Sequence, residues 1–267
     1  MKNDFQLESG LWAGYLRHCA KSAAGGEIRV YDGFEAAWAN TPMPFFNGTV
    51  LNSSVSSEAD LAKRIQGAIL DAVPRELPWL FFLQLDLLPK ELEDRAEELF
   101  ASKGLARIGG LTSMWADEIL PPVRPLPEVA LERIAGRDGR MVCSDLNCLS
   151  YHMPLELGWP AVDAEAICKN PDVDFGYNAG ANGQMVSTST TNVLDDRLYV
   201  SMVATHPDHR QKGYAEAVMR HSLEQAAAVH GMLRTVLHAS EMGRPLYEQM
   251  GYRAVGEWAY FASNANE

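Results

Sequence analysis

The first half of the chain shows two hydrophobic patterns that alternate, one with helical spacing and one of short apolar runs. Ser57 and Asp60 form a capping box, and the apolar residues after them recur at helical spacing. An apolar run bounded by prolines suits a buried strand, and Gly104 ends the charged helix that follows. The pattern therefore predicts a helix, a strand, a helix and a strand at residues 56–73, 78–88, 89–104 and 106–119.

The second half predicts a hairpin and then alternating strands and helices. Its alternating residues turn at Asn182 and Gly183, a dipeptide typical of hairpins, and Gly231 and Gly251 stand where two helices end. The expected elements are a hairpin at 173–193, strands at 197–205, 233–240 and 252–261, and helices at 213–231 and 244–251. Short helices are also expected at 127–138, 149–157 and 161–171. Both halves thus contain a helix, a strand, a helix and a strand in the same order.

A proline-rich segment separates the two halves. Residues 119–134 include four prolines within seven positions, which forbids a continuous helix or a central strand there. We therefore predict an α/β protein with two domains, residues 1–120 and residues 121–267.

Composition and charge limit the classes of partner. The chain has 267 residues, 47% of them hydrophobic, so it can bury a large core, and its formal net charge is −12. The negative charge and the lack of a basic run argue against nucleic acid and favour small molecules or cationic groups. No signal-peptide pattern or membrane-length apolar run is present, so we expect a cytoplasmic protein with no membrane partner. The four cysteines form no CxxC pair, and we expect them to be packing residues: Cys19, Cys143, Cys148 and Cys168.

The segment HPDHRQKGYAEAV, residues 206–218, places cations and small residues where a strand runs into a helix. The amide groups and the dipole at a helix N-terminus bind anions. Gly213 and Ala215 keep side chains out of the way, while Arg210 and Lys212 add positive charge, which suits a diphosphate. Neither the P-loop pattern nor GxGxxG occurs in the chain.

The signature RQKGYA, with the preceding VATHP and the downstream ASEMGRPLYEQMGY, resembles the GNAT superfamily of acyl-CoA-dependent N-acyltransferases. The resemblance is strongest over residues 172–261. It implies a GNAT-like mixed-sheet domain in which strand backbone groups hold the pantetheine arm and the signature holds the pyrophosphate of coenzyme A. Ser240 stands where many members have an asparagine that contacts the pantetheine, and Gly243 stands where alanine is common. The implied cofactor-binding residues are Val203, Ala204, Thr205, Arg210, Gln211, Lys212, Gly213, Tyr214, Ala215 and Ser240.

By the same resemblance, Tyr247 falls where the family often carries its general acid. A tyrosine has a reference pKa of about 10 and can protonate a departing thiolate at neutral pH. Tyr247 also lies on an apolar helix face, so a core role stays open. No single general base can be named, although Glu241, Tyr199 and His238 are near the site in sequence.

The first half lacks the signature at the start of its helix, where Glu58 and Asp60 would repel phosphate. We interpret this half as a degenerate GNAT-like domain in tandem with the second, with a structural role or as a wall of the substrate pocket. Residues 42–51 suit a pocket-lining loop, a dimer loop or a plain core segment, and a homodimer stays open.

The resulting prediction is an N-acetyltransferase, with acetyl-CoA as co-substrate and a small-molecule or peptide amine as acceptor. Direct attack is expected, because no Cys or Ser has a recognisable nucleophile setting. The alternative is a non-catalytic acyl-CoA-binding regulatory module. His206 and His209 flank a proline and lack further ligands at metal-binding spacing, so no metal is expected.

Overall fold

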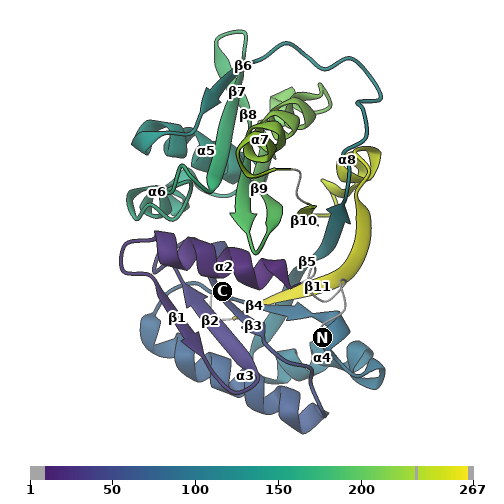
Figure 1. The fold of residues 1–267 in the computed structure, drawn as a ribbon. Coiled ribbons are helices and arrows are strands. Elements are labelled where there is room, and N and C mark those ends of the chain that lie inside the picture. The colour runs from purple at the N-terminus through teal and green to yellow at the C-terminus, as the bar shows by residue number, and fades with distance from the viewer. Residues whose placement is uncertain (1–9, 232–233, 264–267) are drawn as a thin grey trace.

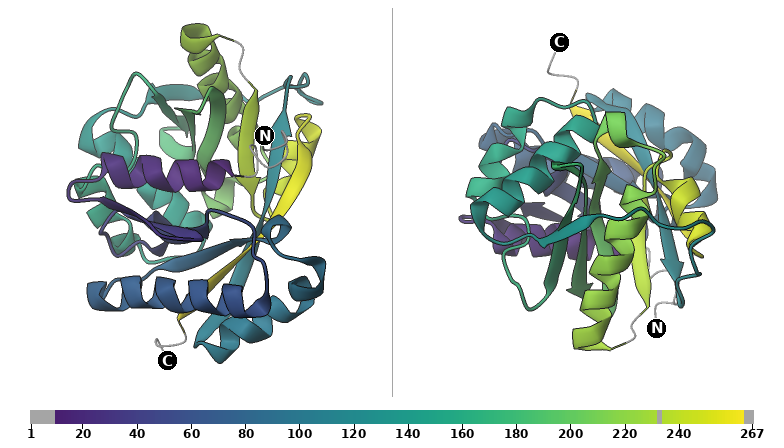
Figure 2. Two further views of the ribbon diagram at one scale, coloured as in Figure 1. Left: turned by 60° about the horizontal axis from the view of Figure 1, so that its bottom comes forward. Right: turned by 90° about the horizontal axis from the view of Figure 1, so that it is seen from above.

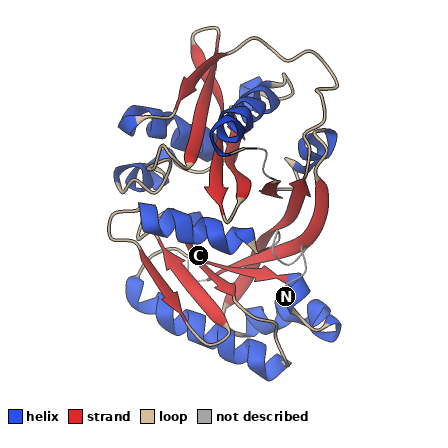
Figure 3. Ribbon diagram, in the orientation of Figure 1, coloured by secondary structure: helices blue, strands red, loops and turns tan. Residues whose placement is uncertain are grey.

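The computed structural model describes residues 10–231 and 234–263. Within these ranges, one 11-stranded sheet runs through the molecule in the order β1-β2-β3-β4-β11-β5-β10-β9-β8-β7-β6 (Figure 1). Helices cover both faces of this sheet (Figure 3). The predicted α/β fold is therefore confirmed, and the strands of both halves share a single sheet.

The first half forms the end of the sheet that begins with β1. Strands β3 and β4 are parallel and are joined through helix α3. The elements are α2 (Leu11–Ser22), β1 (Glu27–Val30), β2 (Phe34–Trp38), η1 (Pro44–Phe46), β3 (Asn47–Leu51), α3 (Glu58–Ala72), η2 (Val73–Arg75), β4 (Leu80–Gln84), η3 (Leu85–Leu87), α4 (Lys90–Ser102) and β5 (Leu105–Ala116).

From β7 onward the second half repeats the order of three strands, a helix, a strand, a helix and a strand, with β9 and β10 parallel and joined through α7. Its elements are β6 (Ala130–Arg133), α5 (Gly136–Ser150), η4 (Leu155–Leu157), α6 (Trp159–Asp163), β7 (Asp174–Ala181), β8 (Gln184–Leu194), β9 (Arg197–Thr205), η5 (Pro207–His209), α7 (Tyr214–His230), β10 (Thr235–Ala239), α8 (Arg244–Gln249) and β11 (Arg253–Ser263).

The last strand of each half pairs with strands of the other half. Strand β11 lies between β4 and β5 and is antiparallel to both, and β5 in turn pairs with β10. The β5–β11 pairing extends from Arg253 to Ser263, along the strongly curved ribbon at the side of the molecule (Figure 1). The two halves are thus joined through β5 and β11, each of which pairs only with strands of the other half. This pairing places β9 and β10 next to residues of the first half.

Helix α2 lies between the two halves (Figures 1 and 2). Its residues Trp12 and Tyr15 belong to a core cluster that includes Phe82 of the first half and Tyr199 of the second. A second core cluster lies between the sheet and helices α3 and α4, and a third lies between the sheet and helices α7 and α8. The rings of Trp12, Tyr15, Phe82 and Tyr199 pack together in the first cluster. Their burial stabilises the contact between the two halves, since each ring removes a large apolar area from water.

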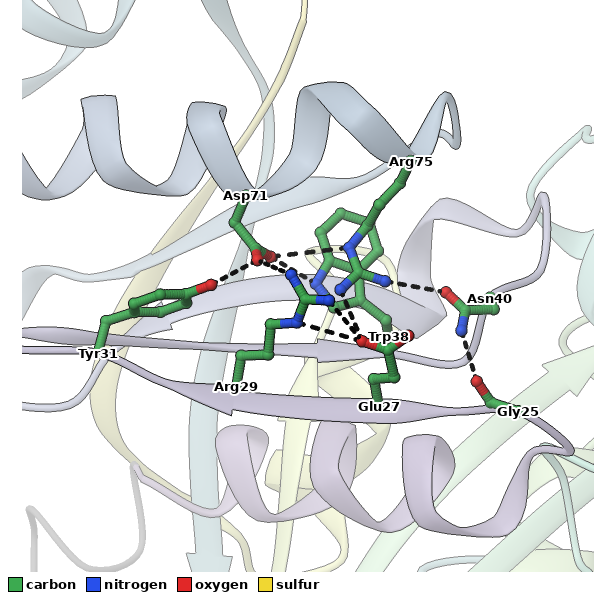
Figure 4. A network of polar contacts seen from close by, with 8 residues as sticks. All are labelled: Gly25, Glu27, Arg29, Tyr31, Trp38, Asn40, Asp71 and Arg75. Carbon is green, nitrogen blue, oxygen red and sulfur yellow. Dashed lines mark hydrogen bonds and ion pairs between the residues drawn. The ribbon is translucent and has the colours of Figure 1, made fainter.

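A buried carboxylate fixes α3 to the β1–β2 hairpin (Figure 4). Asp71 accepts hydrogen bonds from the Tyr31 hydroxyl at 2.6 Å, from Trp38 Nε1 at 2.9 Å and from Arg29 Nη1 at 3.0 Å. Burial raises the pKa of Asp71, but these donors outweigh it and hold the pKa below its ordinary value. Arg75 packs its guanidinium 4.3 Å from the centre of the Trp38 ring. These donors compensate the buried charge of Asp71, so the network stabilises the packing of α3 on the hairpin.

Most predicted elements are confirmed, and one is wrong. Ser57 caps α3 by accepting from the Asp60 amide, and the hairpin turns at Asn182 and Gly183, both with positive φ. The helix predicted at 127–138 is wrong, because residues 130–133 form edge strand β6 paired with β7, and the helix begins only at Gly136. An edge position accommodates the prolines just before this strand, and pairing there outweighs helical propensity.

The other two short helices are confirmed only in part. The segment 149–157 is the end of α5 followed by the turn η4, and α6 covers only the beginning of the segment 161–171. The sequence patterns also gave no indication of α2, β1, β2 or β3. Three of the four cysteines are buried and all are unpaired. In the described part of the chain, no helix has the length and apolar character needed to cross a membrane.

Candidate functional site

The loop between β9 and α7, residues 206–213, forms one end of the candidate site. Gly213 is the N-cap of α7 with φ +85°, and Gln211 before it also has positive φ, 62°. A Cβ at position 213 would lie 3.1 Å from Cδ of Pro127, so both the backbone angle and the space favour glycine. The first amide groups of α7 have no partner within the helix, as at any helix N-terminus, and such groups can bind an anion.

Positive side chains gather around this loop although the chain is acidic. Arg210 Nη2 donates to the carbonyl oxygen of Ser150 at 2.7 Å, at the C-terminal end of α5. Lys212 Nζ donates to the carbonyl oxygen of Asp208, and Arg124 Nη2 donates to that of Gln211. Among the described residues, none of these three cations forms an ion pair with a carboxylate. Their charge is therefore available for a bound anion.

Strands β9 and β10 separate next to the loop. Their parallel pairing covers Leu198–Val200 and Thr235–Leu237 only, so the rest of β9 runs on without β10 beside it. Met202 has φ 51°, and the pairing of β9 with β8 shifts register between Ser201 and Ala204, which marks a bulge. The backbone of Val203, Ala204 and Thr205 thus borders the opening between the strands and can hydrogen-bond a ligand there.

A cavity of about 610 Å³ fills this opening. It is lined by every residue that the sequence predicted for the site except Lys212, whose amine points to Asp208 instead. The lining residues among the predicted ones are Val203, Ala204, Thr205, Arg210, Gln211, Gly213, Tyr214, Ala215, Ser240 and Tyr247. The structure therefore brings a helix N-terminus, an open strand edge and a tyrosine to one cavity.

Tyr247 lies on α8, 8% exposed, within the core cluster under α7 and α8. Burial raises the pKa of its hydroxyl well above the ordinary value, and Tyr151 and Tyr252 add to this shift. Gly243 leaves room for the ring, since a Cβ there would lie 3.0 Å from Cε2 of Tyr247. Tyr247 is both a core residue and a cavity wall, and its hydroxyl stays protonated over the physiological pH range.

The opposite end of the cavity is aromatic. The side chains there come from α2, η1, β9 and β11, and we call them the aromatic wall: Trp12, Tyr15, Phe45, Phe46, Tyr199 and Tyr260. The Tyr15 and Tyr199 rings stack with centroids 5.1 Å apart, and Phe45 meets Tyr260 edge to face at 5.6 Å. Residues 42–51 thus contribute to the cavity, while Phe46 is also part of the core.

A polar pair borders the aromatic wall. The Tyr199 hydroxyl and His238 Nδ1 are hydrogen-bonded at 2.9 Å, with the His238 ring 5.4 Å from Trp12. Burial raises the pKa of Tyr199 well above its ordinary value, so this tyrosine is neutral. Of the three residues considered as a general base, Tyr199 and His238 line the cavity and Glu241 is exposed and does not.

Several cavity residues were missed by the sequence reasoning. Arg124 comes from the proline-rich segment, and its isolated positive charge between prolines was the available signal. Asn147 of α5 donates to the carbonyl oxygen of Met202 at 3.4 Å and so supports the bulge of β9. Ser150 holds Arg210. The last two contacts join residues far apart in sequence, and no local pattern indicates them.

The matching loop of the first half, between β3 and α3, is filled by an internal cation. Arg64 of α3 donates from Nη1 to the carbonyl oxygens of Gly33 and Ser53 and from Nη2 to that of Ser54. It also pairs with Asp60 at 2.8 Å. The loop therefore presents carbonyl groups to a buried arginine, and its space is occupied.

Comparisons with known proteins support the fold. Residues 174–263 match the model of the acetyltransferase (GNAT) domain family. A GCN5-related N-acetyltransferase from Kribbella flavida has a TM-score of 0.70 at 13% identity, covering 97% of this chain and 96% of that chain. A GCN5-related N-acetyltransferase-like protein from Streptococcus suis has a TM-score of 0.56 at 15% identity, covering 97% of this chain and 98% of that chain.

A third solved structure, a GCN5-related N-acetyltransferase from Sphaerobacter thermophilus, has a TM-score of 0.56 at 14% identity and covers 86% of this chain and 76% of that chain. No curated protein sequence matches the chain. At these identities the likenesses establish the fold over both halves, and they confirm the predicted GNAT-like architecture.

Proposed function

We propose that the protein transfers an acetyl group from acetyl-CoA to a primary amine, because residues 174–263 match the model of the acetyltransferase (GNAT) domain family. The observation that carries this proposal is the cavity that joins the 206–213 loop to the aromatic wall and has Tyr247 in its side. One end suits a diphosphate, and the other suits an acceptor. The match to the acetyltransferase (GNAT) domain family supports acyl transfer as the reaction class. The position of the named residues around one cavity supports their proposed roles.

The residues present fit the coenzyme. The open amide groups at the start of α7, together with Arg210 and Arg124, would hold the pyrophosphate. The unpaired edge of β9 at Val203, Ala204 and Thr205 would hold the pantetheine arm through backbone hydrogen bonds. Ser240 cannot supply the amide of an asparagine, but its Oγ lies in the cavity and already accepts from the Gly243 amide.

The chemistry needs a proton for the departing thiolate. Tyr247 is among the residues that line the cavity, and it is protonated at neutral pH because burial disfavours its ionised form. We assign it as the general acid. Direct attack of the amine fits the site, because the buried cysteines lie outside the cavity lining and burial raises the pKa of the thiols of Cys19, Cys143, Cys148 and Cys168.

Substitution of Tyr247 tests the proposal. In Tyr247→Phe we expect kcat for acetyl transfer to fall at least about 100-fold, since general acid catalysis contributes about 100- to 10,000-fold. The affinity for acetyl-CoA, measured by calorimetry, should stay within about twofold, because the cradle is unchanged. Tyr252→Phe is the matched control, since its hydroxyl bonds Thr235 at 2.7 Å within the core and does not line the cavity.

Full activity of Tyr247→Phe would remove Tyr247 as the acid. If the unmodified protein binds acetyl-CoA and shows no transfer to amines, the non-catalytic acyl-CoA-binding module replaces the enzyme.

A further inference from the structure

The segment between β5 and β6, residues 117–129, connects the two halves, and we call it the strap. It leaves β5 in the middle of the sheet, passes α8 and reaches β6 at the edge (Figure 1). Ile119 near its start and Val129 at its end both pack against the core cluster under α7 and α8, which contains Tyr247. The strap is therefore tied to the helix that carries the proposed general acid.

A second set of contacts fixes the strap directly at the end of α8. The Leu120 amide donates to the carbonyl oxygen of Met250 at 3.0 Å, and Met250 is the C-cap of α8. A Cβ at Gly251 would lie 2.9 Å from Cγ of Leu120, so the two segments are in close contact. A displacement of the strap at Leu120 would therefore move the end of the helix on which Tyr247 lies.

The other part of the strap lies against the β9–α7 loop. Arg124 Nη2 donates to the carbonyl oxygen of Gln211 at 3.3 Å, and Cδ of Pro127 lies 3.1 Å from the position of a Cβ at Gly213. Arg124 also lines the cavity at this end. A guanidinium has several N–H donors in one plane, so Arg124 can contact the loop and a phosphate together.

Prolines make the strap stiff. Pro121, Pro122, Pro125 and Pro127 each fix a backbone angle, and Pro125 also restricts Arg124 before it to an extended conformation. A phosphate that binds Arg124 therefore orders little additional backbone, and the contacts at Arg124 and Leu120 are held at a nearly constant separation.

We propose that the strap couples the nucleotide end of the acyl donor to the position of Tyr247: Arg124 binds the donor's phosphate oxygens, and the strap then holds α8 in place through Leu120. The proposal rests on the proposed transfer from acetyl-CoA and adds a regulation of that site. The rate of transfer, and not only the binding of the donor, then depends on a part of the donor remote from the thioester. Leu120 is thus a positioning residue.

The first test uses the nucleotide end without the pantetheine arm. Adenosine 3′-phosphate 5′-diphosphate carries the phosphates of coenzyme A and cannot reach from the loop to α8. At about ten times its Kd, we expect it to slow amide hydrogen exchange of residues 244–252 by about 10-fold, because a segment that opens only without ligand gains the full linkage free energy.

The same measurement on Arg124→Gln tests the arginine. The affinity for the nucleotide, measured by calorimetry, should fall at least about 10-fold, since a hydrogen bond between two charged groups is lost. At about ten times the Kd of the variant, the protection of residues 244–252 should also be lost. Arg95→Gln, at an exposed position of α4, makes the same change in charge and should behave as the unmodified protein.

The second test compares two donors at saturation, with the fastest acceptor among 2-phenylethylamine, hexylamine and 1,6-diaminohexane. We expect kcat to be at least about 10-fold lower with S-acetylpantetheine than with acetyl-CoA, because the truncated donor cannot engage the strap. Arg124→Gln should lower kcat for acetyl-CoA and leave kcat for S-acetylpantetheine within about twofold. Acetyl-dephospho-CoA, which lacks the 3′-phosphate, shows whether that phosphate or the diphosphate binds Arg124.

A variant at the other contact tests the positioning role. Leu120→Ala removes the side chain that packs against Gly251, and we expect kcat for acetyl-CoA to fall at least about fivefold, since a misplaced reacting group costs rate. The affinity for acetyl-CoA should stay within about twofold, because Arg124 is retained. Leu70→Ala, at an exposed position of α3, is the matched control and should keep both values.

The outcomes separate this proposal from the proposed function. Protection of residues 244–252 that persists in Arg124→Gln, absence of nucleotide binding to the unmodified protein, or an equal kcat for the two donors overturns the coupling and leaves acetyl transfer standing. Unchanged kcat in Leu120→Ala overturns it as well. Binding of acetyl-CoA without transfer to any of the three amines defeats the proposed function, and the dependence of its rate on the strap with it.

Discussion

The loops at β9–α7 and β3–α3 occupy the same place in the two repeated halves, yet they have opposite electrostatic character. In the second half, Gly213 is the N-cap of α7, and the nearby Arg210 has no carboxylate partner among the described residues. In the first half, Arg64 reaches back from the second turn of its helix and binds the loop carbonyl groups. The β3–α3 loop thus holds a buried arginine that is paired with Asp60, whereas the cations at the β9–α7 loop have no carboxylate partner among the described residues.

The comparison teaches that a helix N-terminus becomes an anion site only when its surroundings leave the amide groups accessible and the charge unpaired. Glu58 and Asp60 lie in the first turn of α3 and complement the helix dipole themselves. In α7, Glu216 has that position, but its side chain is turned to Arg220 of the next turn. The same backbone plan thus serves stability in one half and, in our proposal, binding in the other.

Charge reversal at the open loop should have the largest effect. In Arg210→Glu we expect acetyl-CoA affinity to fall at least about 100-fold, about 2.7 kcal/mol, since a cation beside the pyrophosphate is replaced by an anion. Calorimetry measures the loss. Lys63→Glu, at an exposed position of α3 in the other half, gives the same change in net charge and should leave the affinity unchanged. Equal affinities for both variants would defeat the assignment of the loop.

Removal of the arginine from the closed loop should affect stability and not binding. In Arg64→Met the carbonyl groups of Gly33, Ser53 and Ser54 lose their donor, and we expect the free energy of unfolding to fall by about 2 kcal/mol. Urea denaturation measures this change, and acetyl-CoA affinity at 25 °C should stay within about twofold. A large loss of affinity without loss of stability would contradict the division of roles between the loops.

Acid should weaken the closed loop through Asp60. Hydrogen bonds from the Arg64 side chain and the Ser56 amide lower the pKa of Asp60 from 3.8 to about 2. A carboxylate with a depressed folded pKa stabilises the fold above its unfolded pKa, and this contribution is lost as pH falls between about 4 and 2. Asp60→Asn should therefore be less stable at pH 7 and show a flatter loss of stability over that window in urea unfolding.

The control for this smaller effect is Asp94→Asn, at an exposed position of α4. It should follow the pH dependence of the unmodified protein. A curve for Asp60→Asn that matches this control would show that the Arg64–Asp60 pair contributes nothing measurable.

The parts of the fold that the sequence predicted are those set by local rules. Caps and glycine stops such as Ser57 and Gly104 fixed the ends of α3 and α4, and the Asn182–Gly183 turn fixed the β7–β8 hairpin. The strand β6 was predicted as a helix, because its identity depends on pairing with β7 and not on its own pattern. The exchanged pairing of β5 and β11 could not be predicted, because strand order depends on contacts between distant residues.

The candidate site divides in the same way. The residues from Arg210 to Ala215 are contiguous and carry a recognisable signature, so they could be found from sequence, and Lys212 alone of that stretch points away from the cavity. The aromatic wall depends on α2 and η1 reaching across from the other half. Trp12 and Phe45 lie far from the signature in sequence, so only the three-dimensional structure could place them in the cavity.

The position of β11 between β4 and β5 makes the two halves depend on each other for strand pairing. Without the first half, β10 would lose its neighbour β5 and present an unpaired edge, and β11 would lose both of its partners. Each half therefore supplies strand partners that the other half needs.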